Sequence, residues 1–392
     1  MNHRRTRPLM KTLCASLVLG LLSGQAWSQR AGPAEFEAFS QGTWTQSFQG
    51  ISEQGTIREG LFSLEATGAS TAPVLLAAHA FLASLDDSQR RQARFTIDDP
   101  QWRTWMNIHR FDRQGVALMD MTPAQQQAAF ALLQASMSPR GYSNLRNVMR
   151  LNHSLAELTS NFEGYNEQRY WFTVMGEPSP TTPWGWQIEG HHLTVNYFVL
   201  GDQVVMSPVF LGSEPTHALG GKYAGTSVLK QEEAKALDLM QNLPAAQQQQ
   251  AHLGAKGRNE NLTEMFKDNA VVPMQGVAAS TLNRENRARL LKLIELYVGN
   301  LRPAHAQVKM REVEAHLDET HFAWKGQIDD DAVFYYRIHS PVLLIEFDHQ
   351  APLALPGDRE VAVREHAHAV IRTPNGNDYG KALLQLHRTR TP

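Results

Sequence analysis

The stretch W-G-W-Q-I-E-G-H-H-L-T-V-N-Y-F-V-L-G-D-Q-V-V-M-S-P-V-F-L-G-S-E-P, residues 184–215, decides the fold of this chain. It holds two aromatic-rich segments joined by Gly201-Asp202, a pattern that predicts a β-hairpin. His191 and His192 are expected to open the first strand. Because side chains alternate across a strand, only one of these imidazoles is expected to face a given site, unless a bulge at Gly190 turns the strand.

A second stretch, E-H-A-H-A-V-I-R-T-P-N-G-N-D-Y-G at residues 365–380, complements the first. His366, His368 and Arg372 recur with the period of two that places side chains on one face of a strand. The two imidazoles are therefore expected to project the same way, with backbones about 7 Å apart.

The first 28 residues have the pattern of an export signal. Basic residues precede an apolar run at residues 13–22, and Ala26-Trp27-Ser28 resembles a cleavage site. We expect cleavage near Ser28 and Gln29 and a periplasmic or secreted protein, by either the general secretory or the twin-arginine route. No other stretch approaches the roughly 18 apolar residues of a membrane helix, so no stable membrane insertion is expected.

The composition of the mature chain restricts its chemistry. Cys14, the only cysteine, lies in the signal, so neither disulfides nor thiolate metal ligands are expected. Without the four basic residues of the signal, 33 Lys and Arg face 39 Asp and Glu, a net charge of about −6. Nucleic acid is therefore not an expected partner. A small molecule or a polymer fragment is the expected substrate, and the sequence leaves the oligomeric state open.

The order of predicted elements indicates an α+β fold with antiparallel or mixed sheets. We divide the chain into a signal (1–28), an N-terminal arm with a buried helix (29–121), a first α+β half (122–243), a connecting segment (244–285) and a second half (286–392). Helices are predicted at residues 74–85, 122–137, 142–159, 227–243, 286–318 with a break at Pro303, and 380–387. Further strands are predicted at 170–175, 321–324, 332–339, 342–349 and 366–372.

The two halves repeat the same order of elements, which indicates an internal duplication. Y-W-F-T-V-M-G and W-Q-I-E-G-H-H-L-T-V-N-Y follow one helix pair, and H-F-A-W-K-G and Y-R-I-H-S-P-V-L-L-I-E-F follow the other. In this alignment Asn196 corresponds to Glu346. We expect the halves to form one compact unit with a site at their interface, where pockets commonly form.

The histidine pairs are candidate metal ligands. His366 and His368 can grip one ion from the same side, and His191 or His192 can complete a three-histidine set with an open position for water. Zinc is the first expectation, and copper or iron is possible because imidazole suits all three. The candidate carboxylates for a base, or for completing the site, are Glu214, Glu346, Asp348 and Asp378, with His349 as a further candidate ligand. The chain has 16 histidines, so the alternative is that these are surface or structural groups.

Aromatic and basic residues near the histidines are candidates for substrate binding. Trp184 and Trp186 form either an aromatic platform for a ligand or part of the core. Arg372, with Tyr379 nearby, either holds an anionic substrate group or pairs with Asp378. No G-x-S-x-G elbow, H-E-x-x-H helix, Walker loop or dinucleotide fingerprint occurs.

The motifs W-G-W-Q-I-E-G-H-H-L-T-V-N-Y, P-V-F-L-G-S-E-P, F-Y-Y-R-I-H-S-P-V-L-L-I-E-F and H-A-H-A-V-I-R-T-P-N-G-N-D-Y-G resemble a family of exported bacterial proteins known as domain of unknown function 3500. The resemblance covers nearly the whole mature chain and implies export and a shared fold, without an assigned reaction. The G-H-H and H-x-H motifs of the family match His191, His192, His366 and His368. The segment R-T-P-N-G-N-D-Y-G is longer than the R-D-P-x-x-D-Y-G form of the family, with Thr373 where Asp is usual.

These observations predict an exported metal-dependent hydrolase. His192, His366 and His368 would bind the ion, and Glu214 or Glu346 would accept a proton from an activated water. The alternatives are a copper or iron oxidoreductase with the same imidazoles, and a non-catalytic periplasmic protein in which Trp184 and Trp186 hold a ligand.

Overall fold

The computed structural model describes residues 46–390, which form an α+β unit around one mixed sheet. The predicted signal and its cleavage site lie outside the described residues. Twelve strands follow the order β1-β3-β4-β5-β7-β12-β11-β10-β9-β8, with β2 on β3 and β6 on β5. The pairing of β1 with β3 is parallel, whereas β12 pairs antiparallel with β7 at the centre and joins the two parts of the sheet.

The strands are β1 (Arg94–Phe95), β2 (Val116–Ala117), β3 (Tyr170–Met175), β4 (Trp184–Gly190), β5 (Leu193–Leu200), β6 (Gln203–Val205), β7 (Val209–Ser213), β8 (Val277–Ala278), β9 (His321–Gly326), β10 (Phe334–His339), β11 (Leu344–Gln350) and β12 (Val363–Arg372). The α-helices are α3 (Ala72–Ser84), α4 (Asp87–Ala93), α5 (Pro123–Ser136), α6 (Pro139–Thr159), α7 (Lys230–Asn242), α8 (Ala245–Ala251), α9 (Arg284–Val298), α10 (Pro303–Ala315) and α11 (Lys381–Arg390). The predicted helices and strands occur with small differences in their boundaries, and the α+β class is confirmed.

Local sequence signals explain where the helices begin. The Thr122 side chain accepts a hydrogen bond from the Gln125 amide, and the Gln125 side chain accepts one from the Thr122 amide. This capping box satisfies amides that have no partner within the helix, and Pro123 occupies the first helical position, where its missing N–H costs nothing. The Asn283 side chain caps α9 by accepting a hydrogen bond from the Asn286 amide.

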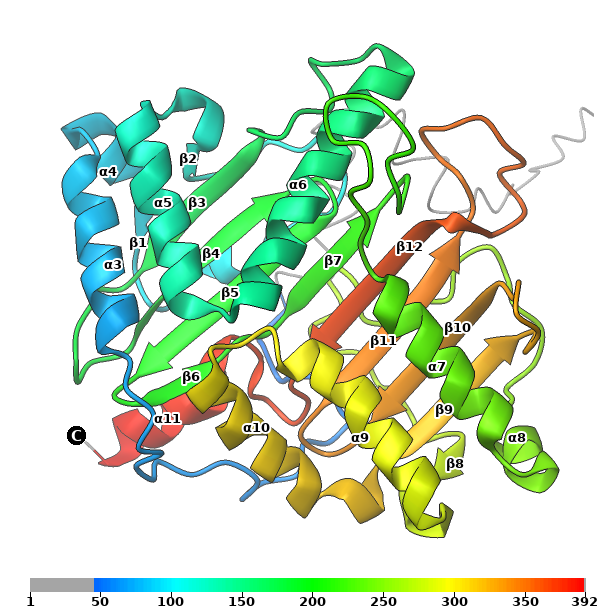
Figure 1. Ribbon diagram of the computed structural model, residues 1–392. Helices are drawn as coiled ribbons and strands as arrows, with labels where there is room; N and C mark the ends of the chain where they lie inside the picture. The colour runs from blue at the N-terminus through cyan, green and yellow to red at the C-terminus, as the bar shows by residue number, and fades with distance from the viewer. Residues whose placement is uncertain (1–45, 391–392) are drawn as a thin grey trace, which may run out of the picture. The chain divides into compact units, whose positions relative to one another are not determined.

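The two faces of the sheet have different covers. Helices α5, α6, α7 and α9 lie against one face (Figure 1), and apolar strand side chains such as Trp186 and Ile188 join the core there. Alternate residues on β4 point the other way. There the Gln187 side chain donates to the Trp102 carbonyl, and Glu189 accepts from the Met106 amide. The second face is therefore polar, and irregular segments cover it.

The N-terminal arm is one of these covering segments. The Asn375 amide donates to the Ile51 carbonyl, and Ser52 forms a β-bridge with Val271. Gly50 has a φ of +99°, and a Cβ there would lie 2.4 Å from the Gly376 amide nitrogen. Only glycine permits both this backbone conformation and the close approach.

The stretch 184–215 differs in part from the prediction. It forms four strands, β4 to β7, and Gly201-Asp202 joins β5 to β6 as predicted. The expectation that His191 and His192 open a strand on opposite faces was wrong. They form the two-residue connection between the paired residues Gly190 and Leu193, and their rings stack with centroids 3.9 Å apart. His192 has a φ of +61°, so strand alternation does not apply there.

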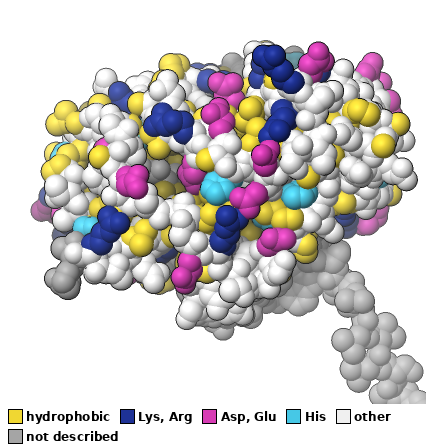
Figure 2. Space-filling view, turned by 90° about the horizontal axis from the view of Figure 1, so that it is seen from below, with side chains coloured by type: hydrophobic (Ala, Val, Ile, Leu, Met, Phe, Trp, Pro, Cys, Tyr) yellow, Lys and Arg dark blue, Asp and Glu magenta, His cyan; other side chains and the backbone are white. Residues whose placement is uncertain are grey.

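The connecting segment is mostly irregular. Beyond α8, residues 252–276 pack over the polar face of the sheet, and the Thr263 amide donates to Glu346 of β11. No helix among residues 46–390 is long and apolar enough to cross a membrane. On the surface seen in Figure 2, acidic and basic side chains are interspersed.

Candidate metal centre

Three histidines converge on the polar face of the sheet. His192, His366 and His368 each offer a ring nitrogen, and these atoms lie within 4.8 Å of one another. Strand pairing explains the convergence, because His368 lies opposite Gly212 of β7. The Gly212 amide in turn donates to the His192 carbonyl, which holds the turn beside β12.

Gly212 leaves room for an imidazole. A Cβ at this residue would lie 2.8 Å from Cδ2 of His368, closer than carbon atoms approach without displacement. The His368 ring therefore lies over the backbone of β7, and any larger residue there would move it.

Hydrogen bonds fix the tautomers of the strand pair. Nδ1 of His366 lies 2.7 Å from the Ala351 carbonyl oxygen, which can only accept, so Nδ1 carries the proton. Nδ1 of His368 lies 3.1 Å from Oε1 of Glu264 and donates to that carboxylate. Both Nε2 atoms then have lone pairs, yet they lie 3.0 Å apart. Two facing lone pairs repel unless a proton or a cation lies between them.

Burial favours the neutral forms of His192 and His368. Desolvation lowers the pKa of His192 and of His368 well below the ordinary value, and the neighbouring imidazoles oppose protonation further. A metal ligand must be a neutral imidazole, so this environment favours cation binding over protonation. The three side chains are buried, with residue exposures of 7%, 0% and 4% in sequence order.

His191 lies next to the cluster and is not among its three residues. Its Nδ1 lies 2.8 Å from Oδ1 of Asn152 on α6, and its carbonyl accepts from the Tyr170 hydroxyl. The ring stacks on His192 and contacts Tyr165 and His109. His191 therefore packs against the His192 ring and is not one of the three candidate metal ligands.

Glu264 is a site residue that the sequence analysis missed. Besides contacting His368, its Oε1 accepts hydrogen bonds from the side-chain amide nitrogens of Asn261 and Gln350, at 2.9 and 3.4 Å. Burial raises the pKa of this carboxyl group. Glu264 lies in the irregular segment 252–276, where no periodicity indicates its direction. The only available signal was its place in a polar segment long enough to cover a site.

Glu214 contacts the cluster from the other side but has a structural environment. Its carboxylate accepts from the backbone amides of Leu353, Ala354 and Leu355, at 2.9–3.1 Å. Oε2 lies 3.8 Å from Nδ1 of His366. The carboxylate thus fixes the loop that follows β11, close to the carbonyl that orients His366.

Glu346 and Asp348 point to the same polar face but lie under residues 252–276. Glu346 accepts from the Leu262 and Thr263 amides and from the Tyr335 hydroxyl, at 2.7–2.9 Å. Asp348 pairs with Lys256 at 3.0 Å, and burial raises its pKa to about 7. Both carboxylates therefore anchor the covering segment.

His349 points to the opposite, helix-covered side. Its Nδ1 accepts from the Phe334 amide, and Nε2 lies 3.5 Å from Glu233 of α7. It does not join the other imidazoles.

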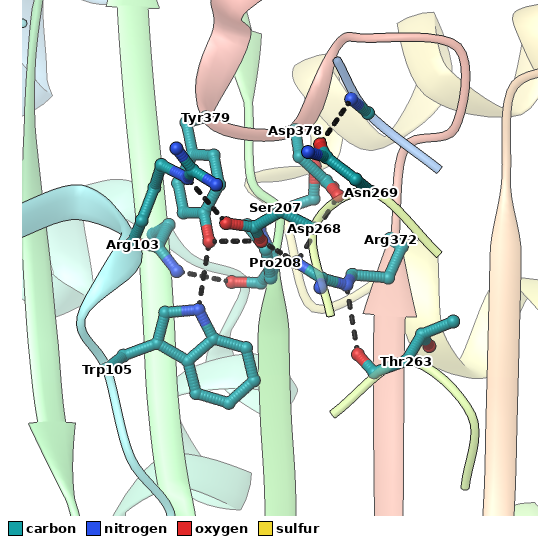
Figure 3. Close-up of polar contacts among 12 residues, drawn as sticks. Arg103, Trp105, Ser207, Pro208, Thr263, Asp268, Asn269, Arg372, Asp378 and Tyr379 are labelled. Carbon is teal, nitrogen blue, oxygen red and sulfur yellow. Dashed lines mark hydrogen bonds and ion pairs between the residues drawn. The ribbon is translucent and has the colours of Figure 1, made fainter. Parts of the chain in front are cut away.

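Arg372 and Asp378 form a separate buried network (Figure 3). Arg372 lies 3.1 Å from Asp268 and 3.3 Å from Asp378, so it has the internal partner that one sequence interpretation gave it. Tyr379 donates to Asp268 and accepts from the Trp105 indole. Burial raises the pKa of Asp378 to about 6. These residues link segments far apart in the sequence.

Trp184 and Trp186 lie in the core instead of on a ligand platform. Both are fully buried on the helix-covered face, where Trp186 stacks on Tyr197 with ring centroids 5.1 Å apart. Of the two interpretations of these residues, the core is the one that the structure has.

The fold and the site define an α+β protein with a buried three-histidine cluster on one face of a mixed sheet. The chain belongs to the family described as protein of unknown function (DUF3500), whose model matches residues 67–381. The resemblance noted in the sequence is thereby confirmed. No curated protein and no solved structure matches the chain.

Proposed function

We propose that the protein is an exported metal-dependent hydrolase that binds its ion through His192, His366 and His368. The single observation that carries the proposal is the 3.0 Å separation of the Nε2 atoms of His366 and His368, both of which have lone pairs. Two nitrogens that each lie about 2.0–2.1 Å from one ion come roughly this close to each other. With both Nδ1 atoms protonated, neither Nε2 has a proton for an N–H···N hydrogen bond between the rings, so an ion between them accounts for the contact.

Zinc is the ion that we propose. Three neutral imidazoles and no thiolate match catalytic zinc sites, in which a fourth position remains for water. A zinc ion there would lower the pKa of a water molecule and so provide a nucleophile at neutral pH.

The protein's own contribution is to orient the ligands and to handle protons. Of the two carboxylates in contact with the imidazole pair, Glu264 has a side chain that is 21% exposed, and Glu214 one that is 3% exposed. The Glu214 carboxylate already accepts hydrogen bonds from three backbone amides. Glu346 already accepts hydrogen bonds from the Leu262 and Thr263 amides and the Tyr335 hydroxyl. We therefore assign the carboxylate role at the site to Glu264, which orients His368 in the way that carboxylates orient metal-bound histidines.

A copper or iron oxidoreductase is the second candidate, because the same all-imidazole ligand set supports it. The third interpretation, a binding protein with Trp184 and Trp186 as its platform, loses support because both side chains lie in the core. Metal content after purification separates the first two candidates.

Alanine at both His366 and His368 tests the proposed function. We expect the double variant to lose bound metal and any hydrolytic activity, while a control His79→Ala, at an exposed residue of α3, keeps both. Metal content is measured by elemental analysis and activity on a panel of esters, amides and phosphoesters. Unchanged metal content in the folded double variant contradicts the proposal.

We further propose that the protein is periplasmic or secreted and acts on a small molecule or a polymer fragment. The basic, apolar and small-residue pattern of residues 1–28 supports export. Expression of the full chain followed by N-terminal sequencing of the periplasmic product tests this. We expect a mature chain that begins near Gln29, and a product retaining Met1 contradicts it.

We also infer that the two halves arose by duplication. Strands β3, β4, β5 and β7 occur in the same antiparallel order as β9, β10, β11 and β12, and the two sets meet at the β7–β12 pair. The junctions of α5 with α6 and of α9 with α10 lie together, where Met137 and Leu301 form an antiparallel bridge.

Glycines in corresponding places support the duplication. Gly115 (φ +97°) and Gly276 (φ +100°) each precede a short strand, and a Cβ on either would lie 2.5 or 2.1 Å from the carbonyl oxygen of Phe172 or Phe322. An alignment of relatives tests the inference. A profile built from residues 116–215 is expected to detect residues 277–374, and failure to do so contradicts common ancestry of the halves.

A further inference from the structure

Thr263 is held from two neighbouring strands. On the β11 side, its amide donates to Oε2 of Glu346 at 2.9 Å, and its hydroxyl also donates to that oxygen. On the β12 side, Nε of Arg372 donates to the Thr263 carbonyl at 3.0 Å, as Figure 3 shows. Every polar group of this residue is therefore bound to a buried side chain of the sheet.

The two anchoring side chains are themselves buried and held by further hydrogen bonds. Glu346 and Arg372 are both 0% exposed. Glu346 also accepts from the Leu262 amide and the Tyr335 hydroxyl, and Arg372 also pairs with Asp268, which follows in the same segment. The segment around Thr263 is thus tied to the sheet at several points within a few residues.

The residue after Thr263 is Glu264, which contacts His368. His368 lies on β12, two residues before Val370 and four before Arg372, so all three side chains point to the same face of the sheet. The strand that supplies the histidine therefore also supplies the arginine that holds the backbone next to its carboxylate partner. This arrangement couples the place of Glu264 to the place of the imidazole.

We propose that Glu346 and Arg372 are positioning residues, which together hold Thr263 so that the Glu264 carboxylate orients His368 for metal binding. The inference builds on the proposed function and gives a task to two residues that the sequence singled out for other reasons. Glu346 and Arg372 act through Glu264 and do not contact the ion.

A double-mutant cycle on zinc affinity tests this proposal. Glu264→Gln is expected to weaken zinc binding on the order of 10- to 100-fold, the usual loss for a partner of a metal-bound histidine. Glu346→Gln is expected to weaken it by a similar or smaller factor. Because both act through one contact, the double variant is expected to bind no more weakly than Glu264→Gln alone.

A matched control uses another buried arginine. Arg337 binds the far end of the same segment, through the Pro273 carbonyl and the Gln275 side chain. Arg337→Met is expected to leave zinc affinity unchanged, whereas Arg372→Met is expected to reduce it. Multiplicative losses in the double variant, or equal losses from both arginine variants, overturn the positioning role.

A milder variant and a readout without metal guard against misfolding. Thr263→Val removes only the hydroxyl contact with Glu346. In nitrogen-15 NMR spectra of the metal-free protein, the His368 ring is expected to carry its proton on Nδ1, and Thr263→Val to weaken that preference. An unchanged His368 signal in Thr263→Val contradicts the inference while leaving the proposed function intact. Absence of zinc binding in the wild type would instead contradict the proposed function.

Discussion

Gly212 lets the His368 ring lie directly over a neighbouring strand, so it controls the geometry of the candidate site without contributing a side chain. Gly212→Ala places a methyl group 2.8 Å from Cδ2 of His368. The ring has to move, and we expect metal affinity to fall on the order of tenfold, as it does when the support of a ligand is lost. Isothermal titration with zinc measures the change.

The control for this variant is Gly220→Ala, because a Cβ at Gly220 meets no atom within 4 Å. It is expected to bind zinc as the wild type does. Equal affinities for Gly212→Ala and Gly220→Ala would show that the observed ring placement does not matter for binding.

A buried histidine away from the metal site makes stability depend on pH. Burial, with Arg337 nearby, lowers the pKa of His339 to about 3. The unfolded state, with an ordinary pKa of about 6.5, binds this proton first, so the stabilisation is present above pH 6.5 and is lost as the pH falls toward 3. His339 contributes at most about 1.4 kcal/mol per pH unit to the dependence of the free energy of unfolding on pH.

His339→Gln removes this titration. Between pH 6.5 and 4, denaturant unfolding of the variant is expected to show a shallower loss of stability on acidification than the wild type. The exposed His79→Gln variant is expected to follow the wild type. A slope for His339→Gln that matches the wild type would mean that His339 is already protonated in the fold.

At the residue scale, the shared direction of His366 and His368 could be predicted from the sequence, whereas the part that Glu264 plays could not. The period of two on β12 is enough to place His366 and His368 on one face. Glu264 contacts His368 across 104 residues, from a segment without regular structure. Its direction depends on Thr263 being held by Glu346 and Arg372, and no local pattern encodes such a tertiary contact.

At the scale of single elements, the caps of α5 and α9 are expected to make comparable contributions to the free energy of unfolding. Thr122→Ala and Asn283→Ala each remove the acceptor for an amide of the first helical turn. Each is expected to lower the free energy of unfolding by about 1 kcal/mol. Urea unfolding measures it, and Thr122→Ser, which keeps a hydroxyl group, is expected to lose much less. A full loss in Thr122→Ser would argue against the cap as the cause.

Capping residues made these helix starts predictable from the sequence. The turn at His191 and His192 could not be predicted in the same way. The G-H-H sequence continues an alternating pattern, so it reads as a strand. In the structure Gly190 packs against Tyr170, where a Cβ would lie 2.3 Å from the ring, and the chain reverses directly afterwards. The turn thus follows a glycine that a residue on the neighbouring strand requires, and sequence periodicity does not contain such a tertiary contact.

At the scale of the whole molecule, the sequence predicted the elements and their repeated order but not the central strand pair. Because β7 and β12 pair, His192, whose carbonyl is bound by Gly212 of β7, meets His366 and His368 of β12. The β7–β12 pair is therefore what brings the three imidazoles together. Which strands pair across 150 residues depends on the packing of the whole sheet, so no local pattern fixes it.

The most direct test of the metal centre is elemental analysis of the mature protein, purified from the periplasm without a histidine tag. We predict about one equivalent of zinc per chain. Copper or iron instead of zinc would favour the oxidoreductase. A protein that holds no metal, even after incubation with zinc, copper and iron salts, would contradict the metal centre.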